Sequence, residues 1–185
     1  QGNAELGAPR IAGLDAQYLG RQLADFRDRR RGSGAGDTFG AQMVTIASML
    51  DDTTIGRLAA FVSAMPEVQV STSIGGDGKA GQATYTTCAA CHGVNGEGSV
   101  SLGAPRLAGM TDSYLARQFA AYASGTRGSA AGDDRGAAMR GITAGVKGDK
   151  AVRDVISYAV SLPGPATMSA TACADQPAGT CGSSR

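Results

Sequence analysis

Tryptophan is missing from this 185-residue sequence, and aromatic residues make up only 5% of it. A chain with so few aromatic side chains has to build its core from small aliphatic residues or take bulk from a bound group. Long apolar runs are missing as well, and a membrane-spanning helix needs about 18 apolar residues in a row. A net charge of +1 gives no strong field. We therefore expect no nucleic-acid partner and at most peripheral contact with a membrane.

Histidine is scarce too, and the one histidine has a distinctive place. His92 directly follows the run CAAC at residues 88–91. Two cysteines three apart with a histidine after the second are the attachment signature of c-type haem. One helical turn sets both thiols against the vinyl edges of one porphyrin and leaves the imidazole beneath the iron. The sequence predicts a covalent haem c on Cys88 and Cys91, with His92 as an iron ligand.

Two other functions of a cysteine pair fit less well. A thioredoxin-type redox pair needs a strand-rich βαβ context. A zinc site needs two more ligands, and the remaining cysteines lie far along the chain. Neither requirement is met near residue 88.

The chain contains an internal repeat. Residues 6–13 read LGAPRIAG and residues 102–109 read LGAPRLAG, so the second copy lies 96 positions later. The same offset relates Tyr18 to Tyr114 and Met43 to Met139, and after one insertion Pro66 corresponds to Pro163. The sequence therefore predicts a first module at residues 1–66, a polar linker at 67–78 and a second module at 79–163.

Each module is expected to be helical. Apolar residues recur at spacings of three and four in residues 15–29, 51–65, 112–124 and 149–162. Acidic residues begin these segments, and prolines follow the second and fourth. No segment shows sustained alternation with β-branched residues, so the predicted fold class is all-α.

The repeated proline, Tyr-Leu-x-x-Gln, Gly/Arg and methionine motifs resemble the dihaem cytochrome c4 family, over nearly all of the chain up to Pro163. The resemblance implies two tandem class I cytochrome c domains related by a pseudo-twofold, each with haem held by histidine and methionine. It also implies electron transfer in the periplasm. In such domains a helix ahead of the haem motif crosses the last helix, which places Gly81 and Tyr85 against Tyr158.

The sixth iron ligand has to be a methionine, since no second histidine exists. Met110, Met139 and Met168 are the candidates in the second half, and a methionine is more often core filler than a ligand. Met110 corresponds to Leu14 in the repeat, whereas Met139 corresponds to Met43. Repeat and family pattern together favour Met139, with Met43 as its counterpart in the first module. Two filled axial positions favour electron transfer over a peroxidase-like reaction.

Further haem contacts follow from the resemblance and the repeat. In class I domains a proline carbonyl accepts the hydrogen bond of the histidine Nδ1, which assigns that role to Pro105 unless it is a simple turn proline. Three arginines recur in both modules and suit haem propionates, although surface arginines are usually just solvated. We expect one or two of Arg106, Arg117 and Arg127 to contact a propionate.

The first module poses a question, because the equivalent of its haem motif would fall before residue 1. One hypothesis is that the chain is an N-terminally incomplete form of a dihaem protein, with Met43 as ligand of a second haem. The other is that this module has lost its haem. The retained Met43 and Pro9 favour the first hypothesis, as does the small core of a module without haem.

Two further segments each allow more than one interpretation. Cys173 and Cys181 lie in a tail, residues 164–185, where an oxidising compartment favours a disulfide, although free thiols or a link to a partner are alternatives. The arginine-rich run at residues 27–31 is either a solvated helix end or a docking patch for an acidic partner.

Two functions fit these features. One is a freestanding carrier between a quinol-oxidising complex and a terminal oxidase or reductase. The other is the electron-accepting subunit of a periplasmic dehydrogenase such as a flavocytochrome c sulfide dehydrogenase. We expect no catalysis by this chain, because its single histidine is committed to iron and leaves little for acid-base chemistry.

Overall fold

The computed structural model describes residue 2 and residues 7–66 and 74–165. Over these ranges the chain is all-α, as predicted, with one isolated bridge between Ser99 and Ala104 in place of any strand. The helices are α1 (Ala16–Arg27), α2 (Thr38–Ala47), α3 (Asp52–Ser63), α4 (Gly78–His92), α5 (Asp112–Ser124), α6 (Asp134–Thr143) and α7 (Asp149–Ser161). None of the described helices is long and apolar enough to cross a membrane.

Aspartate side chains set where most helices begin. The N-cap aspartate accepts a hydrogen bond from a backbone N–H in the first turn of α1, α2, α3, α4 and α6. Such a cap satisfies one of the four N–H groups that a helix start leaves without a partner. Among the helices that periodicity predicted, the caps explain why α1 and α3 begin directly after Asp15 and Asp51.

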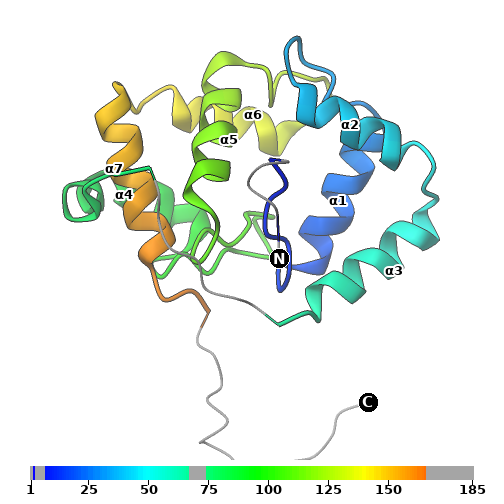
Figure 1. The fold of residues 1–185 in the computed structure, drawn as a ribbon, viewed down its shortest axis with the longest axis horizontal. Helices are drawn as coiled ribbons and strands as arrows, with labels where there is room; N and C mark the ends of the chain where they lie inside the picture. Colours follow the sequence, from blue (N-terminus) through cyan, green and yellow to red (C-terminus); the bar gives the residue numbers. More distant parts are fainter. Residues whose placement is uncertain (1, 3–6, 67–73, 166–185) are drawn as a thin grey trace, which may run out of the picture.

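The two halves of the chain lie side by side, with α1, α2 and α3 in one and α4 to α7 in the other (Figure 1). Helices α1, α2 and α3 correspond in the repeat to α5, α6 and α7. Helix α4 has no counterpart among the described residues of the first half. The domain boundaries at 66 and 78 stay predictions, since residues 67–73 lie outside the described part.

Helix α4 crosses α7 at the place that the family resemblance implied. A Cβ on Gly81 would overlap the backbone carbonyl of Asp154, so only glycine allows this close approach. The rings of Tyr85 and Tyr158 pack edge to face, with centroids 5.3 Å apart. Tyr85 is 3% exposed in a core that includes Val155 and Cys88, which ties the haem motif to this crossing.

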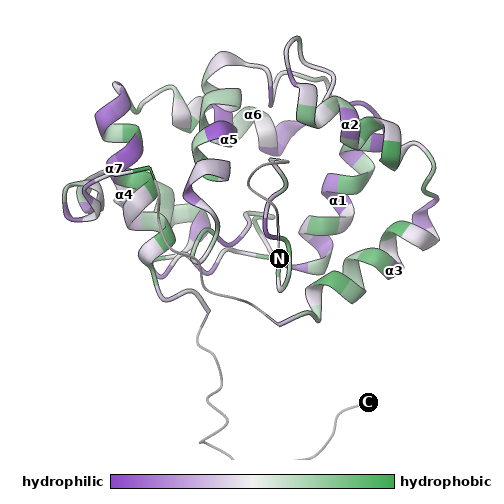
Figure 2. Cartoon of the chain, in the orientation of Figure 1, coloured by the Kyte–Doolittle hydropathy of each residue, from purple (hydrophilic) through white to green (hydrophobic). Residues whose placement is uncertain are grey.

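Helix α3 leaves exposed the apolar face that α7 buries against α4. Leu58 and Phe61 are 40% and 68% exposed. Their repeat counterpart Val155 is 4% exposed, and Tyr158 packs on Tyr85. Figure 2 shows apolar stretches along α3. The first half therefore has an unpaired apolar helix face where the second half has a helix crossing.

Paired contacts join the two halves about a pseudo-twofold. Arg21 Nη2 donates to the carbonyl of Gly103 at 2.9 Å, and its repeat counterpart Arg117 donates to the carbonyl of Gly7 at 2.6 Å. A shared apolar cluster lies behind these bonds, with Leu14, Leu19, Ala59 and Met110 all buried. The predicted pseudo-twofold arrangement is thus present as reciprocal hydrogen bonds around a common core.

The tail from residue 166, with Met168 and the predicted Cys173–Cys181 disulfide, lies outside the described residues. The described end of the linker is held by two carboxylates. Ile74 N donates to Asp112 Oδ2 and Asp77 N donates to Asp154 Oδ1, both at 2.8 Å. These bonds fix where α4 starts.

Candidate haem site

The haem motif forms the last turn of α4. His92 is the last helical residue, and Gly93 ends the helix with φ of 79°. Both thiols are free, with Cys88 half-buried and Cys91 exposed. Burial raises the pKa of the Cys88 thiol above its usual value. The two thiols lie one helical turn apart, with the imidazole directly after them.

His92 is buried and oriented by the loop that follows it. Its Nδ1 lies 2.8 Å from the carbonyl oxygen of Pro105. A proton on Nδ1 donated to this carbonyl leaves Nε2 with a lone pair for a metal. Burial lowers the pKa of His92, which the bond to Pro105 only partly opposes, so the ring is held in its neutral, metal-binding form.

Backbone bonds hold Pro105 in reach of His92. Gly98 N donates to the carbonyl of His92 at 2.8 Å, and Leu107 N donates to the carbonyl of Gly96 at 2.9 Å. The hydroxyl of Tyr85 donates to the carbonyl of Gly93 at 2.9 Å. The loop and the α4–α7 crossing therefore position the imidazole together.

Cys88 lines a pocket of about 270 Å³ between α4 and the α6–α7 connection. Thr84, Thr87, Ile142, Gly145, Val146, Lys147 and Ala151 form the rest of its wall. A mostly apolar opening beside the buried thiol suits a porphyrin edge joined to Cys88. Two free thiols, a neutral imidazole tied at Nδ1 and this opening fit a covalently attached haem.

The candidate methionines fall into two environments. Met139 on α6 and Met43 on α2 are both half-buried, and Met43 packs against Phe26 and Val44. Met110 is 5% exposed and packs with Leu14 in the core between the halves. Met110 is thus buried in the contact between the halves. Among the residues that the structure describes, Met139 is the remaining candidate for the sixth ligand in the second half.

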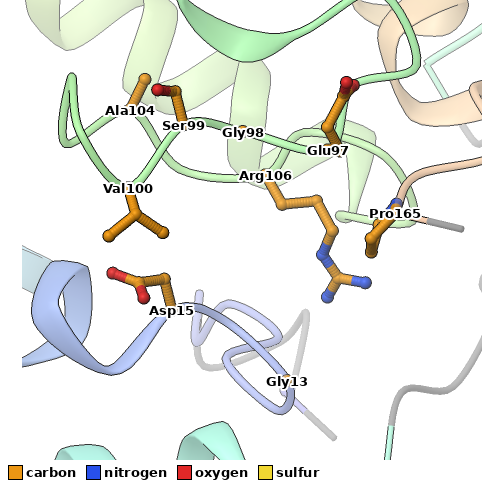
Figure 3. Close-up of a pocket in the computed structure, with 9 residues that line it drawn as sticks. All are labelled: Gly13, Asp15, Glu97, Gly98, Ser99, Val100, Ala104, Arg106 and Pro165. Atoms are coloured by element: carbon orange, nitrogen blue, oxygen red, sulfur yellow. The ribbon is translucent and has the colours of Figure 1, made fainter. Parts of the chain in front are cut away.

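All three arginines predicted to meet propionates reach across to the first half. Arg106 donates to the carbonyl of Ala12 at 3.3 Å, and burial together with Arg10 lowers its pKa. Figure 3 shows Arg106 extending toward the loop of Gly13, in a pocket of about 170 Å³. Arg117 contacts Gly7, and Arg127 contacts Gln22. Their contact with propionates stays a prediction.

The repeat counterparts Arg10, Arg21 and Arg31 make reciprocal contacts, which sequence reasoning did not assign. Arg10 Nη1 donates to the carbonyl of Gly109 at 3.3 Å, and Arg31 Nη2 donates to Gln118 Oε1 at 3.0 Å. Recurrence in both modules was the available signal. It marked the positions as important but could not say that each side chain serves the opposite half.

Two of the four arginines at residues 27–31 pair with nearby carboxylates. Arg27 pairs with Asp28 and Asp52, and Arg30 pairs with Asp25 and Asp28. The solvated helix end therefore fits better than a docking patch.

Comparison with known proteins matches these features to haem proteins. The family model "Cytochrome c" matches residues 78–163. The thiosulfate dehydrogenase electron acceptor of Stutzerimonas stutzeri is 35% identical over 137 residues, which are 68% of this chain and 60% of that protein. Cytochrome c4 of Azotobacter vinelandii is 29% identical over 83% of this chain and 76% of its own length. The chain spans 60% and 54% of the first two curated relatives it matches, the second being cytochrome c-552 of Acidithiobacillus ferridurans.

Solved structures of related proteins superpose on most of this chain. The cytochrome c4 structure of Acidithiobacillus ferrooxidans superposes with a TM-score of 0.68 at 30% identity, covering 83% of this chain and 89% of that one. Cytochrome c4 of Pseudomonas stutzeri gives 0.66 at 26% identity, covering 85% and 86%. A thiosulfate dehydrogenase from Marichromatium purpuratum gives 0.70 at 29% identity, covering 87% of this chain and 34% of that one.

Proposed function

Because this chain belongs to the cytochrome c family and is homologous to the cytochromes c4, we propose that it is a periplasmic carrier of single electrons with His92 and Met139 as the axial ligands of its haem. The matches confirm the predicted family and the all-α fold of two related modules. The curated relatives are named as cytochromes or electron acceptors, which supports the prediction of a non-catalytic electron-transfer chain.

The buried His92 carries this proposal, because its Nδ1 is tied to Pro105 and it directly follows the second of two free thiols. Bound haem supplies a one-electron iron couple. Cys88 and Cys91 hold the group, and His92 offers Nε2 in its neutral form. Pro105 makes the imidazole more basic and fixes its orientation. Met139 would supply the second protein ligand, which would leave the iron no open position for a substrate.

Replacing the proposed sixth ligand tests this role. In the holoprotein, Met139→Ala should abolish the sulfur-to-iron charge-transfer band at the red end of the oxidised spectrum. Met110→Leu is the matched control, because leucine occupies the equivalent position in the first half. Met110→Leu should keep the band. An unchanged band in Met139→Ala would refute the His/Met assignment.

A second haem in the first half is part of the proposal, with Met43 as its ligand. The exposed face of α3 supports it, since Leu58 and Phe61 occupy the positions with which α7 meets α4. A helix carrying a second cysteine pair would pack there as α4 packs on α7. A pyridine haemochrome assay on the native polypeptide should give two haems per chain, and a value of one would contradict this.

The alternative role is an electron-accepting subunit of a periplasmic dehydrogenase. Similarity to chains named as thiosulfate dehydrogenase electron acceptors, and to a thiosulfate dehydrogenase structure, supports a sulfur-oxidising dehydrogenase as the donor. Stable co-purification of the native protein with a dehydrogenase chain, and its reduction by that chain and thiosulfate, would favour this role. Isolation as a lone monomer or homodimer would favour the freestanding carrier.

A further inference from the structure

Two arginines related by the repeat, Arg31 and Arg127, lie together at the interface between the halves. Arg31 Nη1 and Arg127 Nη2 both donate to Gln22 Oε1 at 2.6 Å. Both side chains also donate to Gln118 Oε1. Because they share two acceptor oxygens, the two guanidinium groups are close neighbours, and Arg127 is only 8% exposed.

The partners of this pair are neutral side chains. Arg31 stacks over Phe26 and Arg127 over Tyr122, each guanidinium carbon 4.5 Å from the ring centroid. Arg31 Nη2 also donates to the hydroxyl of Tyr114 at 3.1 Å. The ion pairs of Arg27, Arg30 and Lys150 include neither Arg31 nor Arg127. The side-chain oxygens to which the two arginines donate are thus the neutral ones of Gln22, Gln118 and Tyr114.

The carboxylate nearest in the network is Asp25, which accepts from Gln22 Nε2 at 3.1 Å and is itself paired with Arg30. The positive charge of Arg31 and Arg127 therefore affects neighbouring ionisable groups. Burial opposes ionisation of Tyr114, yet Arg31 and Arg127 outweigh this effect and lower its pKa. Charges in a buried, weakly polarisable setting act over longer distances than charges in water.

Helix α5 contacts both this pair and the core that contains Cys88. Helix α5 presents Tyr114 and Gln118 to the arginines. Its Leu115 and Phe119 pack into the core that contains Cys88. A side chain of the first half thus places positive charge beside a helix that packs against the core containing Cys88.

We propose that Arg31, a residue of the first half, raises the reduction potential of the haem attached to Cys88 and Cys91 in the second half, acting together with Arg127. Reduction adds one electron to the iron, and a nearby positive charge stabilises the more negative reduced state. Arg31 is a tuning residue and not an iron ligand. The inference rests on the proposed haem at His92 but not on a second haem.

Two substitutions with matched controls test the proposal by potentiometric titration of the holoprotein. Arg31→Gln removes one charge, and Gln22→Glu adds a carboxylate beside both arginines while keeping them. Each should lower the potential of the His92 haem by an amount equivalent to about a tenfold change in the reduction equilibrium, about 59 mV. The controls Arg57→Gln on α3 and Gln17→Glu on α1, both at exposed positions, should leave it unchanged.

The relevant haem is identified with Met139→His, since exchanging a thioether for an imidazole lowers the potential of that haem alone. Arg31→Lys keeps the charge, so the reduction potential of this variant should stay close to that of the wild type. Unchanged potentials in Arg31→Gln and Gln22→Glu, with normal spectra, would overturn the proposal. An equal drop in Arg31→Lys would overturn it as well, because geometry and not charge would then set the potential. Failure of the His/Met assignment would appear separately, in the band of the Met139→Ala protein.

Discussion

Gly81 decides whether the haem motif can be held against α7. Any side chain at this position meets the backbone of Asp154 and Val155, which cannot yield without separating the helices. Gly81→Ala should therefore destabilise the holoprotein by about 1–3 kcal/mol, as overpacking does in a closed core. Urea unfolding followed by circular dichroism measures this loss.

Gly78→Ala on the same helix is the matched control. Its Cβ would lie 3.5 Å from Tyr158 N, an ordinary contact. This change should be neutral or slightly stabilising, because alanine restricts the unfolded chain. Equal losses for both variants would contradict the assignment of the close approach to Gly81.

Asp154 is a second residue on which the start of α4 depends. It accepts hydrogen bonds from Lys150 Nζ at 2.6 Å and from Asp77 N at 2.8 Å, and these contacts lower its pKa. A carboxylate whose pKa falls on folding adds stability above its unfolded pKa of about 4. That stability is lost as the pH falls through the lower, folded value.

Asp154→Asn should therefore weaken the pH dependence of stability in acid. Thermal midpoints measured at several pH values below about 5 should fall less steeply in this variant than in the wild type. Asp134→Asn, at an exposed position on α6, serves as the control. If the thermal midpoint of Asp154→Asn falls with pH as steeply as that of the wild type, other carboxylates cause the loss of stability in acid.

At the scale of elements, α1 and α5 end differently although they are repeats of each other. After α1, Arg29 adopts a left-handed backbone with φ of 59°. Its counterpart after α5 is Gly125, the C-cap residue, with φ of 78°. Glycine takes this conformation without strain, whereas a residue with a Cβ does not.

Arg29→Gly should thus stabilise the protein by roughly 1 kcal/mol by relieving the left-handed strain. The converse change, Gly125→Ala, should destabilise it by a similar amount. Chemical unfolding of both variants measures the two effects, and Arg29→Lys, which keeps the charge and the strain, should match the wild type. A gain in Arg29→Lys would mean that something other than backbone strain is involved.

Periodicity found α1, α3, α5 and α7 but not α2 and α6, and it did not show which apolar faces are buried. Acidic residues at the helix starts and apolar spacing are local signals, so these four helices were found close to their true bounds. The exposed face of α3 carries the same apolar pattern as the buried face of α7. Periodicity indicates which face is apolar, whereas exposure depends on what else packs there.

At the scale of the whole molecule, reciprocal arginine contacts hold the halves together. Arg21 and Arg117 each donate to a carbonyl of the opposite half. Removing both with Arg21→Ala and Arg117→Ala should cost about 1 kcal/mol each, since the groups are partly exposed. Unfolding by urea should then separate into two transitions. Arg57→Ala on α3 should leave one transition, and a single transition in the double variant would contradict the role of these contacts.

The sequence alone determined the haem motif, the repeat, the all-α class and the pairing of Met139 with Met43, because these depend on spacing within a turn or on direct comparison of two copies. The tertiary structure decided that Met110 packs between the halves and that the recurrent arginines reach across the interface. A side chain's partner depends on which distant segments pack beside it. A long arginine can reach several such segments, and only the packed interface selects among them.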